Sequence, residues 1–444
     1  MNPLSYAGWA ELGFSLLDVL LVFAIARTIR RGAAFTWTVT LLFAVGNWVG
    51  QNYYAPQAFS FALYLTACLL LLRYATAEPG RLGRWAERLL TRPALRAGPG
   101  TPSDEPPRNG TPLAATIGVL LLQAVMVASH QLTPFLAVMA VLPLSVLGFF
   151  RPRWVGPAML GLAVLYLVPN FTYVQEHFGL FSGFDPVANV TYSPAAPAAS
   201  TAAVLQGRGV NLISGIVLAI AFAGYLRNLW NGNVRLTLIV MWLAVAPALS
   251  LLGQTYGGEG KFRVFLFGLP WYAIGGAWLL TGVADRPMHR LLAWLRGVVL
   301  VVLTALFVFT YYQPEADYQV PRSDVAAAQW LDGSLNAGNA VIAASGNFPV
   351  LIGPNYPLIS EPQSTLTDLA TSSPEQLTAD DVKRVITGLQ RPTFIVFSDN
   401  QTRYADAHHL LSESQMAGLE AGLAGDPDIQ LVYDVDGVRI YRYG

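Results

Sequence analysis

Cysteine and charge are both scarce in this 444-residue sequence. Cys68 is the only cysteine, which excludes an internal disulfide, and a formal net charge of zero gives no reason to expect a nucleic-acid partner. Charged residues make up 12% of the chain and hydrophobic residues 54%, with a mean hydropathy of +0.44. One apolar core could not hide that much apolar surface, so a water-soluble globule is excluded and the expected surrounding is a lipid bilayer.

Ten apolar spans, each of about 17–22 residues, alternate with loops in the first part of the chain. The sequence therefore predicts an α-helical polytopic membrane protein with about ten transmembrane helices. We expect these helices near residues 12–29, 34–50, 57–73, 113–129, 133–150, 154–171, 209–227, 236–253, 262–283 and 295–312.

The basic residues predict how these helices are oriented. The loops after the first, third, fifth, seventh and ninth spans hold 17 basic residues, whereas the opposite membrane loops hold only Arg208, Lys261 and Arg263. The positive-inside rule then places both the N-terminus and everything after the tenth span outside the cytoplasm. Met1 to Glu11 is not a cleavable signal peptide, so an outward N-terminus predicts that helices upstream of Met1 are missing.

Arginine accounts for 25 of the 27 basic residues, and alanine, glycine and proline are abundant. This bias indicates a GC-rich bacterial genome, and we expect an actinobacterial plasma membrane. Residues 74–112 form a predicted cytoplasmic loop rich in arginine, proline and glycine, with a short basic amphipathic stretch followed by a linker. Its arginines predict a solvated loop held near anionic headgroups, without a catalytic role.

The composition changes after the tenth span, which predicts a membrane domain over 1–312 and a soluble, extracytoplasmic α/β domain over 313–444. In the second domain we expect a helix over 324–335, strands over 340–344 and 393–398, and a hairpin over 431–443 that turns at Asp436 and Gly437. The domain carries no glycine-rich phosphate loop, no metal-binding His-Glu motif and no serine nucleophile motif.

Polar residues cluster in three of the outer loops, where polar groups close to membrane depth indicate function. The first cluster lies between Asn47 and Gln57, and an aromatic interface belt with an ordinary turn is its alternative interpretation. The second lies at a tight helix-helix turn, where a histidine could equally cap a helix. The residues of these two clusters that we expect at a site are Gln51, Asn52, Tyr53, Tyr54, Gln57, His130 and Gln131.

The third cluster is the segment from Gln254 to Arg263, in which glycines permit a close backbone approach. Glu259, Lys261 and Arg263 supply charges of both signs, and the two cations make this the best candidate for a phosphate site. The alternative is a flexible loop whose charges pair with one another or with lipid headgroups.

In this order and on this side, the three segments resemble a group of actinobacterial membrane proteins related to the GT-C glycosyltransferases. The resemblance rests on the stretches NWVGQNYYAPQAFSFALYL, ASHQLTPF and GGEGKFRVFLFGLPW, and on an outer C-terminal domain that begins near SDVAAAQWL. It implies a polyprenyl-phosphate-linked sugar as donor and a glycan, lipid or protein as acceptor. It places Lys261 and Arg263 on the phosphate, His130 and Gln131 near the donor, and residues 51–54 along the site.

The sequence departs from the GT-C pattern where that family carries its catalytic base. The large first outer loop with the usual aspartate is absent ahead of the first span, and Asn52 stands where the family tends to have an acidic residue. Asp18 lies inside the first span, where an ionisable group is by default functional or paired. The catalytic residue stays open among Glu259, Asp185 and Asp18; Glu11 and Glu176 are further outer carboxylates.

Two functions fit these observations. The first is a GT-C-like glycosyltransferase, or a shortened relative, which moves a sugar from a polyprenyl-phosphate carrier to an envelope acceptor. The second is a non-catalytic membrane subunit or a transport component of envelope glycan assembly. The sequence predicts no metal site, and it leaves open whether a divalent cation takes part.

Overall fold

The computed structural model describes residues 4–90, 112–178, 201–252, 260–281, 289–312, 319–359, 364–371 and 377–444. The chain divides into two compact units. The first comprises residues 1–194 and 209–309, and the second comprises residues 195–208 and 310–444.

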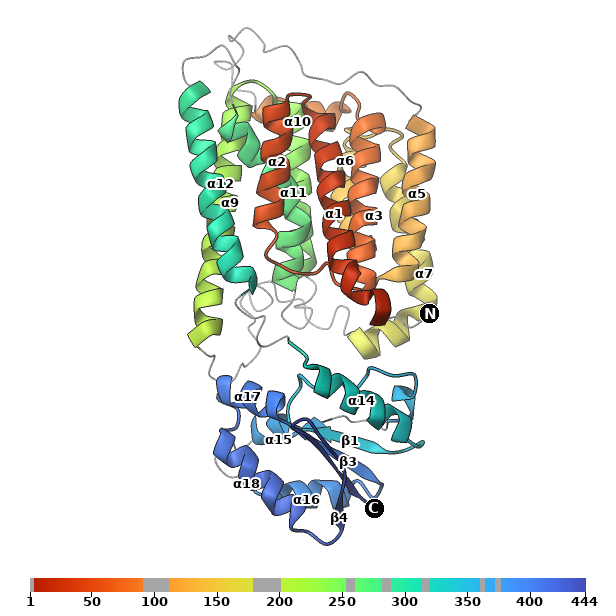
Figure 1. Cartoon of the computed structure of the whole chain (residues 1–444). Helices are drawn as coiled ribbons and strands as arrows, with labels where there is room; N and C mark the ends of the chain where they lie inside the picture. The colour runs from red at the N-terminus through yellow and green to blue at the C-terminus, as the bar shows by residue number, and fades with distance from the viewer. Residues whose placement is uncertain are drawn as a thin grey trace. The chain divides into compact units, whose positions relative to one another are not determined.

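The first unit is a bundle of long apolar helices, as expected for a polytopic membrane protein (Figure 1). Eight helical spans in the described ranges are long and apolar enough to cross a membrane, and α2 and α6 are shorter apolar helices of 14 residues each. The helices are α1 (Leu4–Ile29), α2 (Ala33–Gly46), α3 (Pro56–Leu70, continued by a π turn over Leu71–Ala75), α5 (Pro112–Ser129), α6 (Thr133–Val146), α7 (Val155–Phe178), α9 (Thr201–Trp230), α10 (Val234–Val245, continued by a 3-10 turn over Ala246–Leu252), α11 (Gly260–Leu280) and α12 (His289–Tyr312).

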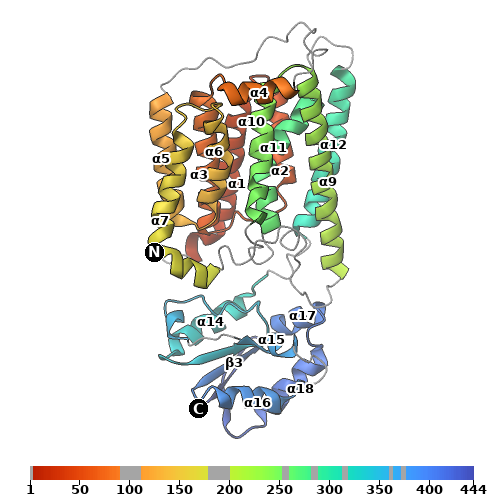
Figure 2. The same ribbon diagram turned by 180° about the vertical axis from the view of Figure 1, so that it is seen from behind.

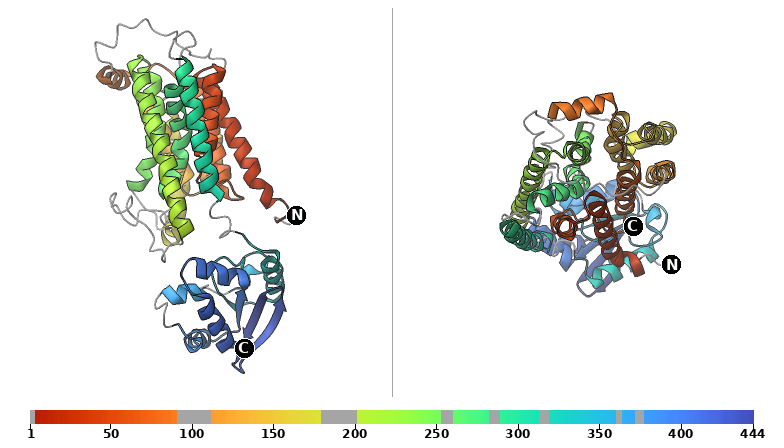
Figure 3. Two further views of the ribbon diagram at one scale, coloured as in Figure 1. Left: turned by 60° about the vertical axis from the view of Figure 1, so that its left-hand side comes forward. Right: turned by 90° about the horizontal axis from the view of Figure 1, so that it is seen from above.

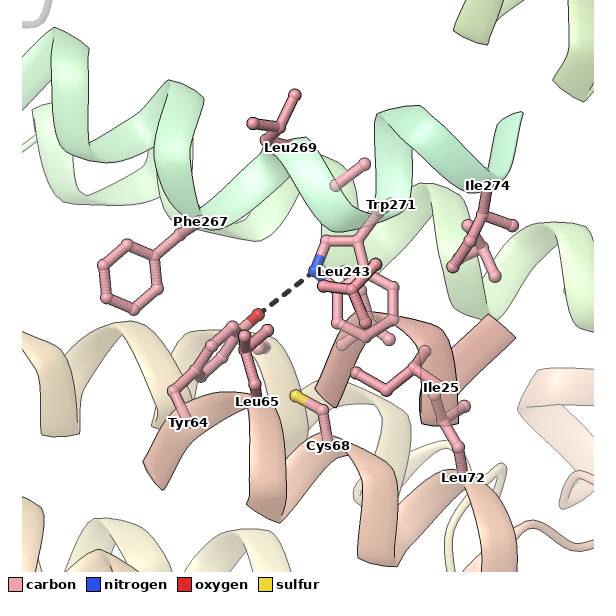
Figure 4. Packing of buried hydrophobic residues seen from close by; sticks show 14 of the residues in the cluster. Ile25, Tyr64, Leu65, Cys68, Leu72, Leu243, Phe267, Leu269, Trp271 and Ile274 are labelled. Carbon is pink, nitrogen blue, oxygen red and sulfur yellow. Dashed lines mark hydrogen bonds between the residues drawn. The ribbon is translucent and has the colours of Figure 1, made fainter. Parts of the chain in front are cut away.

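Helix α11 forms the centre of the bundle because its apolar residues are buried along nearly the whole helix. Trp271 is fully buried, and its indole Nε1 donates a hydrogen bond to the Tyr64 hydroxyl of α3 at 3.3 Å (Figure 4). Tyr225 of α9 donates in turn to the backbone oxygen of Trp271 at 2.9 Å. These bonds join three helices in the interior, where an unpaired polar group would be costly.

A short amphipathic helix, α4 (Arg81–Leu90), follows the π turn that ends α3. It lies across the end of the bundle rather than along its axis (Figures 2 and 3). The sequence predicted this amphipathic stretch, and the described part of the loop from residue 74 to residue 90 confirms it as a helix.

The second unit is a small α/β fold with a five-stranded sheet in the order β2-β1-β3-β5-β4. Strands β1, β2 and β3 are parallel, and β4 and β5 form an antiparallel hairpin that turns at Asp436 and Gly437. The strands are β1 (Ala340–Ala343), β2 (Ser364–Thr365), β3 (Thr393–Ser398), β4 (Ile429–Val435) and β5 (Val438–Tyr443).

Helices cover both faces of this sheet. On one face, Ala327 and Leu331 of α14 (Arg322–Ser334) pack with Val341 and Val396. On the other face, Ile342 and Ile395 pack with the apolar residues of four helices. These are α15 (Leu366–Thr371), α16 (Ala379–Gly388), α17 (Asp399–Ala407) and α18 (Glu413–Ala424); a 3-10 turn spans Tyr356–Leu358. The helix, strands and hairpin predicted for this part of the sequence are confirmed.

Candidate functional site

The described residues of the three polar segments singled out in the sequence lie at one end of the bundle, where α3, α6 and α11 begin and α5 ends. Ser60 of α3 and Ser129 of α5 share a hydrogen bond of 3.0 Å between their hydroxyls. The Trp48 ring lies 5.6 Å from the ring of Phe262 and 5.4 Å from that of Phe265, measured between ring centroids. These contacts join the 47–57 segment to the start of α11 and the start of α3 to the end of α5.

His130 occupies the turn between α5 and α6 and is held there by the backbone. Its Nδ1 accepts hydrogen bonds from the backbone N–H of Thr133 at 3.1 Å and from that of Leu132 at 3.3 Å. The Thr133 hydroxyl lies 3.0 Å from the same nitrogen. Thr133 is the first residue of α6, so the imidazole caps donors that the helix itself leaves unpaired.

Arg263 reaches the other side of the same imidazole from the first turn of α11. Its Nη1 lies 3.2 Å from Nε2 of His130, although the two residues are 133 positions apart in the sequence. The Arg263 side chain is buried, with 6% of its surface exposed. The structure thus brings together two of the site candidates, His130 from the second polar segment and Arg263 from the third.

The hydrogen bonds at Nδ1 decide which nitrogen of His130 carries the proton. A backbone N–H can only donate, so Nδ1 must accept, and a neutral ring then has its proton on Nε2. The Nε2–H group and the guanidinium of Arg263 are therefore two donors that face each other. A phosphate oxygen within reach of both groups could accept hydrogen bonds from each of them.

The electrostatic surroundings keep His130 neutral. Burial, and secondly the positive charge of Arg263, lower the pKa of His130 from 6.5 to about 4. The uncharged imidazole can still donate from Nε2, and Arg263 contributes the full positive charge. The pair therefore offers one neutral and one charge-assisted donor to an anion.

A second polar group lies where the 47–57 segment meets α1. The Asn52 side-chain Nδ2 donates to the Ser15 hydroxyl at 2.5 Å and to the Glu11 backbone oxygen at 3.4 Å. Asp18 follows one turn after Ser15 and is 3% exposed. Among the described residues, Oδ1 of Asp18 and Oδ1 of Asn52 are buried without a hydrogen-bond partner. A buried acceptor without a partner is uncommon in native structures, which marks both oxygens for attention in the proposal below.

The other candidates of the 47–57 segment differ in exposure. Gln57 is buried at the start of α3 and its side-chain nitrogen donates to the side-chain oxygen of Gln51. Tyr53 and Tyr54 are 54% and 55% exposed, which suits an aromatic belt at the membrane interface as well as a site wall.

The remaining candidates divide into those that the structure describes and those that it does not. Lys261 is exposed on the first turn of α11, and Gln131 is partly buried beside His130. Glu259 and Asp185 lie outside the described residues. Within the described ranges, no group of three or more His, Cys, Asp or Glu side chains could hold a metal ion.

Three residues that support the candidate site were not predicted from the sequence. Thr133 and Ser15 hold His130 and Asn52, and Ser60 ties α3 to α5. The His130-x-x-Thr133 spacing at the start of an apolar span was the one available signal, because a polar side chain just before a helix start can cap it. Ser15 and Ser60 gave no signal of their own.

No protein-family model and no curated protein matches the chain. Solved structures similar to it include the apo oligosaccharyltransferase of Archaeoglobus fulgidus, at 11% identity and a TM-score of 0.46, with 92% of this chain and 60% of that chain covered. ArnT from Cupriavidus metallidurans, bound to undecaprenyl phosphate, is similar at 12% identity and a TM-score of 0.48, with 98% of this chain and 83% of that chain covered.

A third similar structure is that of AglB from Archaeoglobus fulgidus in complex with an inhibitory peptide and a dolichol-phosphate, at 12% identity and a TM-score of 0.47. The match covers 93% of this chain and 60% of the archaeal chain, so this chain spans about 60% of that protein's length. At these identities and TM-scores the likeness carries no argument about activity. What the described residues establish is a polytopic membrane protein with a small α/β unit.

Proposed function

We propose that the chain is a GT-C-like membrane glycosyltransferase, or a shortened relative, that uses a sugar carried on a polyprenyl phosphate. The observation that carries the proposal is the pair of donors formed by His130 Nε2–H and the Arg263 guanidinium, 3.2 Å apart. The donors lie at the end of an apolar bundle, where a phosphate on a lipid carrier would reach them while its tail stays among the helices. That a sugar is transferred rests on the resemblance of the three sequence segments to GT-C glycosyltransferases.

The proposal includes an orientation. The uneven distribution of arginine supports placing the His130 and Arg263 end outside the cytoplasm of a bacterial plasma membrane, together with both termini. The acceptor would then be a glycan, a lipid or a protein of the envelope. Lys261 is exposed two residues before Arg263 and about 200° from it around α11, so a contact of Lys261 with the same phosphate rests on the sequence prediction alone.

Transfer of a sugar to a hydroxyl or amide acceptor needs a base to remove its proton. Asp18 is the described carboxylate best suited to this role, because it is buried next to the polar contact between Ser15 and Asn52. Asn52 itself cannot accept a proton as a base, but its amide can orient a substrate group through a hydrogen bond. Asp18 would therefore remove the proton of the acceptor, and Asn52 would position a substrate group.

The test is transfer of a radiolabelled sugar from its polyprenyl phosphate to membrane acceptors by purified protein and by Arg263→Ala. We expect Arg263→Ala to lose at least about 100-fold in activity, because a buried charge-assisted contact to the phosphate is removed. Arg290→Ala is the matched control, since Arg290 is exposed on the first turn of α12 at the other end of the bundle. Equal activity of both variants would refute the role of Arg263.

Binding and transfer separate the two functions that fit the sequence. A folded protein that binds the carrier and transfers its sugar is an enzyme. Binding without transfer supports the alternative, a carrier-binding subunit or transport component of envelope glycan assembly. If a demonstrably folded sample shows no binding and no transfer, both functions are refuted.

A further inference from the structure

Helix α4 lies at the other end of the bundle from the candidate site, and eight of its ten residues form three distinct faces. An α-helix turns by about 100° per residue, so positions separated by three, four or seven residues share a face. Two residues face the bundle, three apolar residues form a second face, and three arginines form a third. Each face spans about 60° of the helix circumference or less.

The first face fixes α4 to the bundle. Gly83 is buried against the turn after α6: a Cβ at this position would lie 2.9 Å from the Leu147 backbone oxygen and 3.3 Å from the Phe149 ring. One turn later, Glu87 accepts a hydrogen bond from Arg235 at 3.3 Å. Gly80, which precedes the helix, donates its backbone N–H to Leu147 at 2.9 Å. The orientation of α4 on the bundle is therefore set by contacts on one side.

The second face is apolar and unusually exposed. Leu82 is 64% exposed, and Trp85 and Leu89 are each 62% exposed. These residues share a stripe within about 60° of the helix circumference. A stripe with a central tryptophan on a helix that lies across the bundle axis matches the membrane-water interface, where tryptophan is enriched.

The third face carries only positive charge. Arg81, Arg84 and Arg88 are all exposed and lie within about 60° of one another, on the flank of the apolar stripe. Arg84 also donates to the Pro79 backbone oxygen at 3.1 Å, which ties its side chain to the start of the helix. Arginines on the flank of an inserted apolar stripe reach the phosphate layer of the bilayer.

We propose that α4 is an interfacial helix that binds anionic phospholipids. Its apolar stripe of Leu82, Trp85 and Leu89 enters the acyl boundary, and Arg81, Arg84 and Arg88 bind the anionic headgroups. The bilayer is the occupant favoured by the structure, because α4 is fixed beside the ends of helices that are long and apolar enough to span a membrane and presents exposed apolar and cationic groups on adjoining faces. This inference does not depend on the proposed sugar transfer.

The experiment places spin labels on α4 in the full-length protein, in a Cys68→Ala background that removes the only native cysteine. Leu82→Cys and Leu89→Cys report on the apolar stripe, and Arg84→Cys is the matched control on the basic face. The protein is reconstituted in nanodiscs of phosphatidylcholine with and without phosphatidylglycerol. Collisions with oxygen, which enters lipid, are compared with collisions with a water-soluble nickel complex.

We expect labels at positions 82 and 89 to be reached several-fold better by oxygen than by the nickel complex, and the label at position 84 to show the reverse preference. Equal access of the nickel complex to all three labels would overturn the proposal, because the stripe would then face water. Exclusion of both reagents from positions 82 and 89 would also overturn it, because a second copy of the protein would then cover the stripe.

Binding of anionic headgroups by the three arginines is measured separately. Phosphatidylglycerol retained per protein is measured for the unmodified chain and for a variant with Arg81, Arg84 and Arg88 replaced by glutamine. Each arginine near an anionic surface changes binding by about fivefold, so retention is expected to fall by more than about tenfold in the triple variant. Unchanged retention would show that the arginines do not select anionic lipid.

Discussion

At the scale of single residues, His130 shows how backbone donors decide the chemistry of a side chain. Thr133 and Leu132 occupy Nδ1, so the proton moves to Nε2, where Arg263 already directs a donor. An anion could accept hydrogen bonds from both groups, and this supports our proposal of a phosphate at this position.

The low pKa of His130 predicts a pH dependence of stability. In the folded protein His130 stays neutral down to about pH 4, whereas the unfolded chain takes up a proton near pH 6.5. The unfolded state therefore binds more protons between these values, and the free energy of unfolding should fall as the pH falls from 6.5 to 4, by at most about 1.4 kcal/mol per pH unit.

Thermal unfolding midpoints in detergent micelles, measured from pH 7 to pH 4, check this expectation. His130→Gln keeps a hydrogen-bonding side chain but cannot titrate, so the difference between the two proteins should shrink steadily toward low pH. A constant difference across the window would contradict the low pKa.

Asp18 gives a prediction about activity. If it is the base, Asp18→Asn should lower sugar transfer by at least about 100-fold, in line with the usual contribution of general bases, and leave carrier binding within about twofold. Glu78→Gln is the control, because the Glu78 side chain is 81% exposed and lies just before α4, at the other end of the bundle. Full activity of Asp18→Asn in the transfer assay would mean that another outer carboxylate removes the proton of the acceptor.

At the scale of helices, α9 and α11 approach each other closely because of a glycine. A Cβ at Gly224 would overlap the backbone oxygen of Gly275, whereas a Cβ at Gly215, on the same helix α9, would meet nothing within 4 Å. Small residues at such crossings allow two backbones to pack where no side chain would fit.

Gly224 and Gly215 make a matched pair for a stability prediction. Gly224→Ala should destabilise the bundle by about 1–3 kcal/mol, because the added methyl forces the helices apart. Gly215→Ala should be neutral or stabilising by up to about 1 kcal/mol, since alanine favours a helix over glycine. Thermal unfolding midpoints of the two variants, measured in the same detergent, test this prediction. Equal shifts in both variants would contradict the close approach of α9 and α11.

Much of the secondary structure could be predicted from the sequence, because it depends on local patterns. The apolar spans predicted ten helices, and β3 spans the predicted residues 393–398. The start of α9 at Thr201 rather than near 209 could not be predicted, since its first turns carry no long apolar run. Strand β2 has only two residues and exists through its pairing with β1, which is a tertiary effect.

The candidate site was predictable only as three separate segments. Polarity at the ends of apolar spans marked His130 and Arg263, but their contact depends on how α5, α6 and α11 pack. The support from Ser15 to Asn52 likewise joins α1 to a distant loop. Such contacts arise from tertiary structure, and a single sequence contains no direct signal for them.

At the scale of the whole molecule, the membrane unit has a different chemistry at each end. One end holds the partly buried His130 with the buried Arg263, together with exposed tyrosines, and the other holds α4 with its three arginines. The arginine-poor end supports a site for a lipid-linked phosphate, and the arginine-rich end supports contact with anionic lipid. Both assignments are proposals that solution experiments can separate.

The most direct test of the central claim is a double-mutant cycle for binding of a polyprenyl-phosphate-linked sugar to the purified protein. We compare the unmodified chain with His130→Gln, Arg263→Gln and the double variant. If both side chains hold one phosphate, each single variant should bind about tenfold or more weakly, and the double variant should lose clearly less than the product of the two losses. Losses that multiply, or affinities that do not change, would contradict a shared phosphate site.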